Sequence, residues 1–468
     1  MELFAANQPV FFQQVQSSLD DFLFGSPSFK MIAGLNAYPN QFANDRVDSR
    51  PKLFFNEAGV IQMVDPRCPS CGHLLVKWGT NPRTMILDQG HVPEIRGVQR
   101  YRCPVHGEIH VDLSHVIAPG CVYAENWRRR ARQLVADGHT PPDVVRIFIK
   151  CFGCSPSETS IRGWVAEAAD AAGIVVHEGE VPTSGYYGCD EIHANLRGNK
   201  VYIQTSIDLH TKFLPAIGYA LELSDMALED FFLDMHVKPS SKIDGLVLDG
   251  LQGYDRVLTS SPFDGISIQL CQTHFKKNLT EKIYDAAGLG YKLKQPLPEP
   301  FDQVKKLLFA PFNRTSQMKA EFTLAYADLC LEGKVSKAVD RILKNYHKKF
   351  DLVFQHLNCP ALDATNNKVE QLNHKLERYP TLKTAMQTGK GMKRITDMIA
   401  FMINHDQFPV YNELMNARLS RLKDRVAKDP TDSDAIKEIE NLIRYMSTVA
   451  GWQAKYDDIF NRYFRILD

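Results

Sequence analysis

Three acidic residues stand at positions that a folded chain could bring together. Asp190 interrupts an apolar run typical of a β-strand, and Asp249 directly follows another buried-looking run. Glu370 opens a later helical pattern and has Asn366 and Asn373 one turn to either side on its own face. Carboxylates held close together repel unless a cation neutralises them, and oxygen atoms are the ligands that Mg²⁺ prefers. Taken singly, each acid is ordinary, but together they are candidate ligands of a divalent metal.

A second group of residues has the spacing of a structural zinc site. The runs Cys-Pro-Ser-Cys-Gly and Cys-Pro-Val-His-Gly each place two ligands about one tight turn apart, and strand-like runs separate them. This layout predicts a zinc ribbon with three thiolates and one imidazole around Zn²⁺. The predicted ligands are Cys68, Cys71, Cys103 and His106. His73 and His110 are close alternatives for the fourth position.

The carboxylates need a sheet to position them. Residues 186–221 contain three strand-like runs with short connections, and a helical pattern follows at 224–234. A buried-looking strand at 245–249, a short helix and a fifth strand at 266–271 come next. The order βββαβαβ predicts a mixed α/β sheet of the ribonuclease-H-like (RNase H-like) kind. Its first and fourth strands are neighbours, which would bring the first two acids together at the carboxyl edge.

Three short helices are predicted between the ribbon and the sheet. Thr140 can cap the second helix, and a tight turn precedes the third, which opens after residue 157 with small polar side chains. This pattern predicts a helix-turn-helix that enters the major groove of DNA, although a plain helical connector is an alternative. The predicted DNA contacts here are Arg128, Arg129, Arg130 and Arg162.

The predicted fold class is therefore multidomain α/β. An RNase H-like mixed sheet is interrupted by an all-α insertion and preceded by the ribbon and the helix-turn-helix. The predicted regions are an N-terminal arm with one helix (1–60), the zinc ribbon (61–122), the helix-turn-helix (123–178), the first part of the catalytic core (180–275), the helical insertion (276–359), the second part of the core (360–405) and a C-terminal helical region (406–468).

Over about residues 185–405 the sequence resembles DDE transposases of the Mutator-like and bacterial insertion-sequence type. The residues that match the three catalytic positions, in order, are Asp190, Asp249 in Leu-Asp-Gly and Glu370 in Asn-Asn-Lys-Val-Glu. Cys271-Gln-Thr-His274 matches the Cys-x-x-His motif of the family. The ribbon and helix-turn-helix are also similar to the DNA-binding regions of such proteins. One departure is His106, where a ribbon often has a fourth cysteine.

The resemblance implies an enzyme of DNA transposition and recombination. The three acids would hold two Mg²⁺ or Mn²⁺ ions, water would cleave at the transposon end, and the freed 3′-hydroxyl would attack target DNA. His274 would lie beside the site and position the scissile phosphate or the catalytic helix; a capping histidine beside a packed cysteine is the alternative. The implied partners are double-stranded DNA, with terminal inverted repeats and a target, and at least one further copy of the chain.

The charge balance first argues against a nucleic-acid partner. The chain has 55 Lys and Arg against 55 Asp and Glu. Locally, however, residues 271–350 hold 15 basic against 8 acidic side chains, and residues 368–394 hold seven against two. These segments would line a DNA path beside the site, so Lys276 and Lys277 are further predicted DNA contacts. Lysines on helices are also commonly just solvated.

Composition excludes several other classes. An apolar fraction of 44% can build cores, and ten cysteines are too dilute for a disulfide scaffold. No apolar run approaches the roughly 18 residues of a membrane span, so we expect no membrane partner. We expect a cytoplasmic protein associated with the bacterial nucleoid, or a nuclear one in a eukaryote. An RNase H-like nuclease or resolvase and a domesticated, non-catalytic DNA-binding regulator are the alternative functions.

Overall fold

The structure is a computed structural model. It describes residues 53–466 apart from 87–93, 112–116, 118–120, 239, 241, 251–252, 259–261, 264, 292–294, 314–320, 322–323, 326, 329–336, 378 and 380–387. The helix predicted in the N-terminal arm lies outside the described residues. The chain divides into two compact units: residues 1–128 with 149–154 and 467–468, and residues 129–148 with 155–466. The described chain is mixed α/β with two mixed sheets and many helices, so the predicted multidomain α/β class is confirmed.

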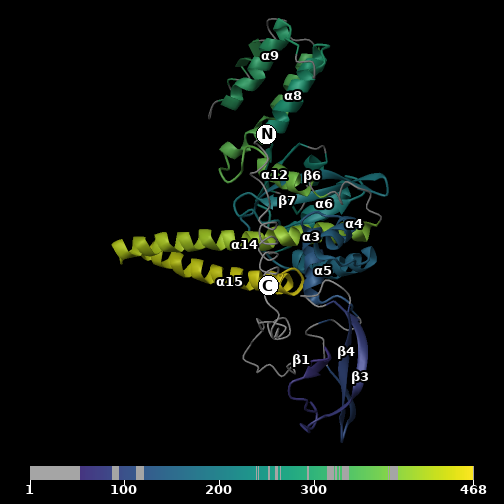
Figure 1. The fold of residues 1–468 in the computed structure, drawn as a ribbon. Helices are drawn as coiled ribbons and strands as arrows, with labels where there is room; N and C mark the ends of the chain where they lie inside the picture. The colour runs from purple at the N-terminus through teal and green to yellow at the C-terminus, as the bar shows by residue number, and fades with distance from the viewer. Residues whose placement is uncertain are drawn as a thin grey trace, which may run out of the picture. The chain divides into compact units, whose positions relative to one another are not determined.

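The first unit contains a small sheet built around a long hairpin (Figure 1). Its strands are β1 (Leu53–Phe55), β2 (Ile61–Met63), β3 (Val76–Met85), β4 (Glu94–Cys103) and β5 (Gly107–His110). Their order is β1-β2-β4-β3, with β5 paired to β4. Leu53, Ile61 and Tyr101 are fully buried between the strands, and the Tyr101 hydroxyl accepts a hydrogen bond from the Met63 amide at 3.0 Å. Cys68 and Cys103 belong to the same core.

The segment after this sheet is helical. Its elements are α3 (Glu125–Ala136), α4 (Pro141–Ile147), the π-helix η1 (Phe148–Phe152) and α5 (Glu158–Glu178). Thr140 and Asp143 form a capping box at the start of α4, which confirms the predicted cap at Thr140, and Ser157 caps α5. Arg132, fully buried, donates to the Trp164 carbonyl at 3.0 Å and joins α3 to α5. Most of the predicted region 123–178 thus packs within the second unit.

A five-stranded sheet forms the centre of the second unit. Its strands are β6 (Tyr186–Leu196), β7 (Asn199–Asp208), β8 (Ile217–Ala220), β9 (Gly245–Leu248) and β10 (Ser267–Leu270). Their order is β10-β9-β6-β7-β8: β6, β7 and β8 are antiparallel, β9 is parallel to β6, and β10 is parallel to β9. The predicted element order and the pairing of the first strand with the fourth are therefore present.

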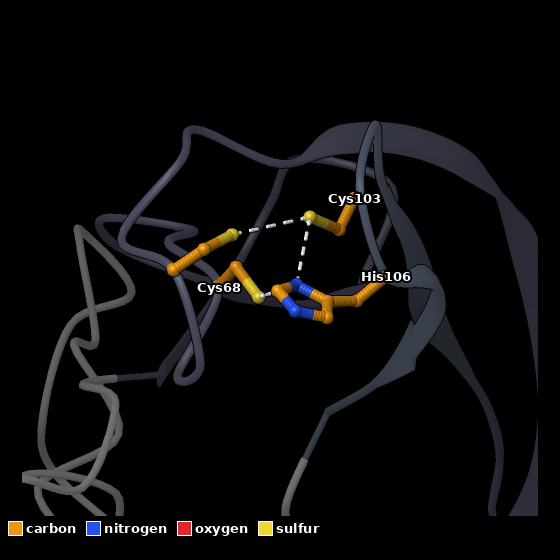
Figure 2. Close-up of side chains that lie close together, drawn as sticks. Cys68, Cys103 and His106 are labelled. Carbon is orange, nitrogen blue, oxygen red and sulfur yellow. Dashed lines mark hydrogen bonds between the residues drawn. The ribbon is translucent and has the colours of Figure 1, made fainter.

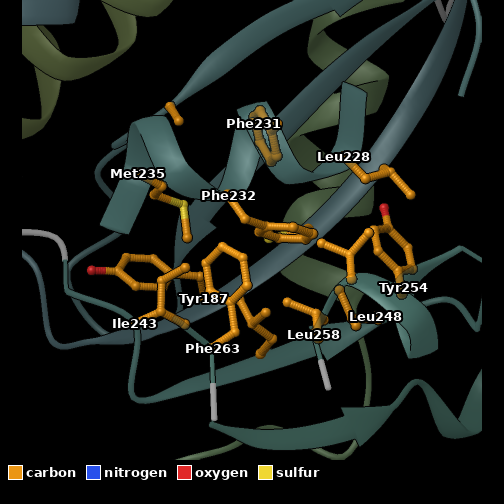
Figure 3. Close-up of a cluster of buried hydrophobic side chains, with 14 residues drawn as sticks. Tyr187, Leu228, Phe231, Phe232, Met235, Ile243, Leu248, Tyr254, Leu258 and Phe263 are labelled. Atoms are coloured by element: carbon orange, nitrogen blue, oxygen red, sulfur yellow. The ribbon is translucent and has the colours of Figure 1, made fainter. Parts of the chain in front are cut away.

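The helices α6 (Asp225–His236) and α7 (Tyr254–Val257) supply a large apolar core against this sheet. Figure 3 shows Phe231, Phe232 and Met235 from α6 gathered with Tyr187 of β6 and Tyr254 of α7. Rings in this cluster meet edge to face, which aromatic pairs favour. The packing holds β6 and β9 in place where the acidic residues emerge.

A helical insertion follows β10. Its described elements are α8 (Gln272–Ala286), α9 (Glu299–Phe309), the 3₁₀ turn η4 (Ala310–Asn313), α11 (Lys337–Val353) and the 3₁₀ turn η5 (Gln355–Leu357). They share a core in which Leu343, Tyr346 and Phe350 are buried. The insertion contains only helices and turns among the residues described, as predicted for 276–359, although α8 begins a few residues earlier.

The described helices after the insertion are α12 (Asn367–Leu376), α14 (Gly389–Lys428) and α15 (Ser433–Tyr463). The long helices α14 and α15 run side by side (Figure 1) and pack with α5. Asn404 of α14 bonds both backbone groups of Leu214, at 2.8 and 2.9 Å. Helix α14 runs without a break through the predicted boundary between 405 and 406. No described helix has the length and apolarity needed to cross a membrane.

Candidate metal centres

Four side chains of the first unit converge as the cysteine spacing predicts. The Cys68 sulfur lies 3.4 Å from His106 Nδ1, the Cys103 sulfur lies 3.7 Å from the same nitrogen, and the Cys71 and Cys103 sulfurs are 3.6 Å apart. Figure 2 shows Cys68, Cys103 and His106 directed toward one another. A tetrahedral zinc with Zn–S bonds of about 2.3 Å has ligand-to-ligand edges of roughly 3.5–3.8 Å. The donor set and its spacing therefore fit Zn²⁺.

Two tight turns present these ligands. The Gly72 amide donates to the Cys68 carbonyl at 2.8 Å, and Gly72 and Gly107 adopt the left-handed conformations that glycine favours. His73 contributes its backbone carbonyl to the Cys68 amide, and the group of four ligand atoms includes His106 rather than His73. The side chain of His110 lies outside the described residues.

The electrostatics of this group favour the thiolate at Cys68 and Cys103. At Cys71 a hydrogen bond from the His73 amide lowers the pKa, but burial and the neighbouring Cys68 and Cys103 sulfurs raise it above its usual value. Burial raises the pKa of the Cys68 thiol, but hydrogen bonds from the Ser70 and Cys71 amides and from neighbouring thiols bring it down to about 6. The pKa of Cys103 is lowered in the same way, against burial, by the amides of His106 and Val105. The thiolate is the form that binds metal.

The second unit brings together Asp190 and Asp249. The parallel ladder pairs Gly188 of β6 with Val247 of β9, so the two acids, each two residues further on, fall at the same level. Ligand oxygens of Asp190, Asp249 and Glu191 lie within 4.8 Å of one another. This juxtaposition is the one that the strand order predicts.

Glu191 is a member of this acidic group that the sequence reasoning missed. Alternation along a strand places neighbouring residues on opposite faces, so strand pattern alone does not predict that Glu191 joins Asp190. The Tyr254 hydroxyl donates to Glu191 Oε1, and the Glu191 amide donates to Asp190 Oδ1 at 2.9 Å. The sequence feature that could have identified Glu191 is the presence of two adjacent acidic residues inside an apolar strand.

The acidic group is strongly perturbed. Burial, reinforced by the charge of Asp249, raises the pKa of Asp190 to about 6. Burial and the charges of Asp249 and Asp190 raise the pKa of Glu191 to about 8. Such shifts are expected where like charges are desolvated together, and they mark candidate functional sites. A hard divalent cation such as Mg²⁺ fits this oxygen-only donor set.

Helix α12 carries Glu370, and two asparagines fix it on the sheet. Asn366 Nδ2 donates to the Cys189 carbonyl at 2.8 Å, and Asn373 Nδ2 donates to Asp190 Oδ2 at 2.8 Å. The Thr205 hydroxyl donates to Asn373 Oδ1 at 3.0 Å. Asn366 and Asn373, one turn to either side of Glu370, therefore hold α12 against β6.

Glu370 itself groups with the Cys-x-x-His motif rather than with the two aspartates. Ligand atoms of Cys271, His274 and Glu370 lie within 4.8 Å of one another, with His274 Nδ1 at 3.7 Å from Glu370 Oε1. Interaction with the Cys271 sulfur raises the pKa of His274 to about 9, and the charges of Glu370 and Asp249 add to this shift. Because His274 also lowers the pKa of Asp190, it lies near both groups.

The predicted DNA contacts divide into buried and exposed residues. Arg128 and Arg129 are buried: Arg128 pairs with Glu125 at 3.0 Å, and Arg129 donates to the Arg462 carbonyl at 3.2 Å. Both guanidinium groups are used inside the protein, which disfavours the predicted DNA contacts at these two positions. Arg130 is partly buried.

The other predicted contacts are accessible. Arg162 is exposed on the first turn of α5 and pairs with Glu158 at 3.3 Å. Lys277 is exposed on α8, and the Lys276 ammonium lies 4.4 Å from the centre of the Phe312 ring. These three residues stay candidates for phosphate contact.

Comparison with known proteins adds little. No family model matches the chain, and no curated protein matches it. Among solved structures, the chain is similar to one chain of the cryo-EM structure of the simian T-cell lymphotropic virus intasome in complex with PP2A regulatory subunit B56 gamma. The identity is 8%, the TM-score is 0.16, and the match covers 38% of this chain and 67% of that one. A similarity this weak supports no conclusion about fold or function.

Proposed function

We propose that this chain is a DNA transposase of the DDE type, which cleaves DNA at transposon ends and joins the freed ends to target DNA. The observation that carries the proposal is the placement of Asp190 and Asp249 at one level of two parallel neighbouring strands, β6 and β9. A paired acidic edge of this kind suits phosphodiester chemistry that depends on divalent metal.

The strand order supports an RNase H-like core for this proposal. Three antiparallel strands precede two parallel ones, and the helical insertion separates β10 from the helix that carries Glu370. The motif residues then follow the order expected of such an enzyme. Two features support DNA binding by the part of the chain that precedes this core: the group of four ligands in the first unit that suits zinc, and the exposed first turn of α5.

In this mechanism, Asp190, Asp249 and Glu191 would hold Mg²⁺ or Mn²⁺ at the sheet edge. Bound there, such ions activate the attacking oxygen and stabilise the leaving oxygen of an in-line displacement. Asn373 keeps Asp190 oriented through its 2.8 Å hydrogen bond, and Tyr254 does the same for Glu191. Glu370 would join the acidic group when DNA and metal are bound, moving from its position beside His274. His274 then becomes a positioning residue for the phosphate.

Asparagine variants of the two aspartates test the proposal. Asp190→Asn and Asp249→Asn should each abolish Mg²⁺-dependent cleavage of DNA that carries the transposon end, because each removes a metal-binding charge. Binding of the same DNA, measured by fluorescence anisotropy, should be unchanged. As a matched control, Asp234→Asn on α6 removes an acid outside the group and should cleave normally. Full cleavage by either active-site variant would overturn the assignment.

A strand-transfer assay separates this function from that of a nuclease or resolvase. Pre-cleaved ends with a free 3′-hydroxyl should be joined to a target duplex by the wild-type chain. Cleavage without joining would support the nuclease, whereas end binding with neither activity would support a non-catalytic regulator.

A further inference from the structure

Cys271, His274 and Glu370 form a second group of potential metal ligands beside the acidic one. Their donors are a thiol, an imidazole and a carboxylate, and one ligand atom of each lies within 4.8 Å of the others. His274 Nδ1 and Glu370 Oε1 are shielded from solvent, and neither finds a hydrogen-bond partner within the described part of the chain. At 3.7 Å they are too far apart for a hydrogen bond, although a protonated His274 would form an ion pair with Glu370 at this distance.

Buried polar atoms of this kind call for a physical explanation. Most buried polar atoms in proteins have a partner, and those without one commonly face a bound water or ion or serve in chemistry. Here the two atoms face each other beside a sulfur. Tetrahedral coordination by nitrogen and oxygen at about 2.0–2.2 Å gives a ligand edge of roughly 3.4 Å. The observed 3.7 Å needs only a small closure.

The fold holds the three ligands from separate elements. Cys271 is the residue before α8 and His274 lies in its first turn, so the two side chains share one side of the helix start. Glu370 comes from α12. The Asn366 amide donates to the Cys271 sulfur at 3.3 Å, and the Gln272 amide donates to the Ala364 carbonyl at 3.0 Å. These bonds tie the start of α8 to the start of α12.

The chemistry of the donors selects the ion. Mg²⁺ binds oxygen ligands, so a thiolate and an imidazole disfavour it. Soft and borderline ions such as Zn²⁺ bind thiolate and imidazole, and three protein ligands with one open position are a common zinc arrangement. The adjacent acidic group, which offers only oxygen, has the opposite preference.

We propose that Cys271, His274 and Glu370 bind one thiophilic divalent ion, Zn²⁺ or its substitutes Co²⁺ and Cd²⁺, at a site separate from both the ribbon and the acidic group. If the proposed transposase function holds, this ion would withdraw Glu370 from the Mg²⁺ site. Zinc would then inhibit cleavage through Glu370, and the binding itself would be independent of that function.

Metal stoichiometry of the full chain tests the site directly. The protein is dialysed against buffered Zn²⁺ with excess Mg²⁺, and bound zinc is measured by elemental mass spectrometry. The wild-type chain should hold about two zinc ions, one in the ribbon and one in the second unit. Cys271→Ser should hold about one, because serine can keep the hydrogen bond from Asn366 but is a poor zinc ligand.

Two further variants assign the ions. Cys71→Ser in the ribbon should lose one ion and keep the other, and combining it with Cys271→Ser should lose both. Cys359→Ser is the matched control, since Cys359 lies outside the group and should leave both ions bound. Circular dichroism verifies that Cys271→Ser and Cys359→Ser are folded.

Co²⁺ gives a second readout that does not depend on activity. The wild-type minus Cys271→Ser difference spectrum should contain a thiolate-to-cobalt charge-transfer band, and His274→Gln should weaken it. Equal zinc content in the wild-type chain and a folded Cys271→Ser would overturn the site. If zinc binds but does not inhibit cleavage, the proposed metal site is retained and only its effect on Glu370 is refuted. If no cleavage occurs at any concentration of Mg²⁺ or Zn²⁺, the result counts against the transposase function.

Discussion

At the scale of single residues, the acidic edge of the second unit depends on groups that orient its carboxylates. Asp190 accepts from Asn373, and Glu191 accepts from the Tyr254 hydroxyl. Tyr254 is 3% exposed, and its ring packs on Phe232 of α6. The phenol thereby links the apolar core to the candidate metal ligands. Such outer contacts keep ligand oxygens in position and strengthen metal binding.

Tyr254→Phe tests this link, because it removes the hydroxyl and keeps the packed ring. We expect Mn²⁺ affinity at the acidic group, measured by calorimetry, to fall about 10-fold. Tyr187→Phe is the matched control: its ring lies in the same core, but its hydroxyl faces the Lys242 carbonyl at 3.5 Å. Equal Mn²⁺ affinities for Tyr254→Phe and the wild type would show that Tyr254 only fills space.

The residue pairs show which parts of the site could be predicted. Asp190 and Asp249 were predictable because strand order and parallel register alone bring them together. Glu191 was missed because strand alternation alone does not predict it. The pairing of Glu370 with His274 depends on how α12 packs against the sheet and the start of α8. The sequence spacing between these distant segments does not determine that packing. Burial of Arg129 likewise depends on a carbonyl more than 300 residues away in the chain.

At the scale of elements, the position of α12 decides where Glu370 lies. Asn366 is fully buried and reaches across to β6, where its side-chain oxygen passes close to Gly188. A Cβ on Gly188 would stand 2.5 Å from Asn366 Oδ1, which no real contact allows. The glycine is therefore required for the close approach of α12 and β6, rather than for a turn.

Gly188→Ala should destabilise the protein, because either Asn366 or the whole helix must move. Overpacking of this kind costs about 1–3 kcal/mol of unfolding free energy. Gly451→Ala on α15 is the control, since its new Cβ meets nothing within 4 Å and should stabilise by about 0.5–1 kcal/mol. Urea unfolding followed by circular dichroism measures both.

A double variant tests the cause. Asn366→Ala removes the atom that the new methyl group would strike, so Gly188→Ala should cost less in that background than alone. Additive costs would contradict a direct clash between these two residues.

At the scale of the whole molecule, the two compact units have different sources of stability. The second unit has extensive apolar cores around β6 and within the helical insertion. The core cluster between the strands of the first unit is small, and two of its buried members, Cys68 and Cys103, are themselves predicted zinc ligands. Small folds with so little apolar burial commonly depend on metal, and zinc binding energy then becomes folding energy.

Zinc removal should therefore unfold the first unit alone. With a strong chelator, amide hydrogen exchange in β3, β4 and β5 should accelerate by at least about 100-fold, because zinc sites of this kind contribute on the order of 10 kcal/mol. Exchange in β6 and β7 should stay unchanged, since their long antiparallel ladder and apolar core contain no ligand of the ribbon.

Cys103→Ser should reproduce the effect without chelator, whereas Cys151→Ser, which changes an exposed cysteine outside the ribbon group, should not. Slow exchange in β3 and β4 after verified zinc loss would mean that the apolar cluster alone stabilises this sheet. Acceleration in both units would mean that the second unit also depends on zinc for its fold.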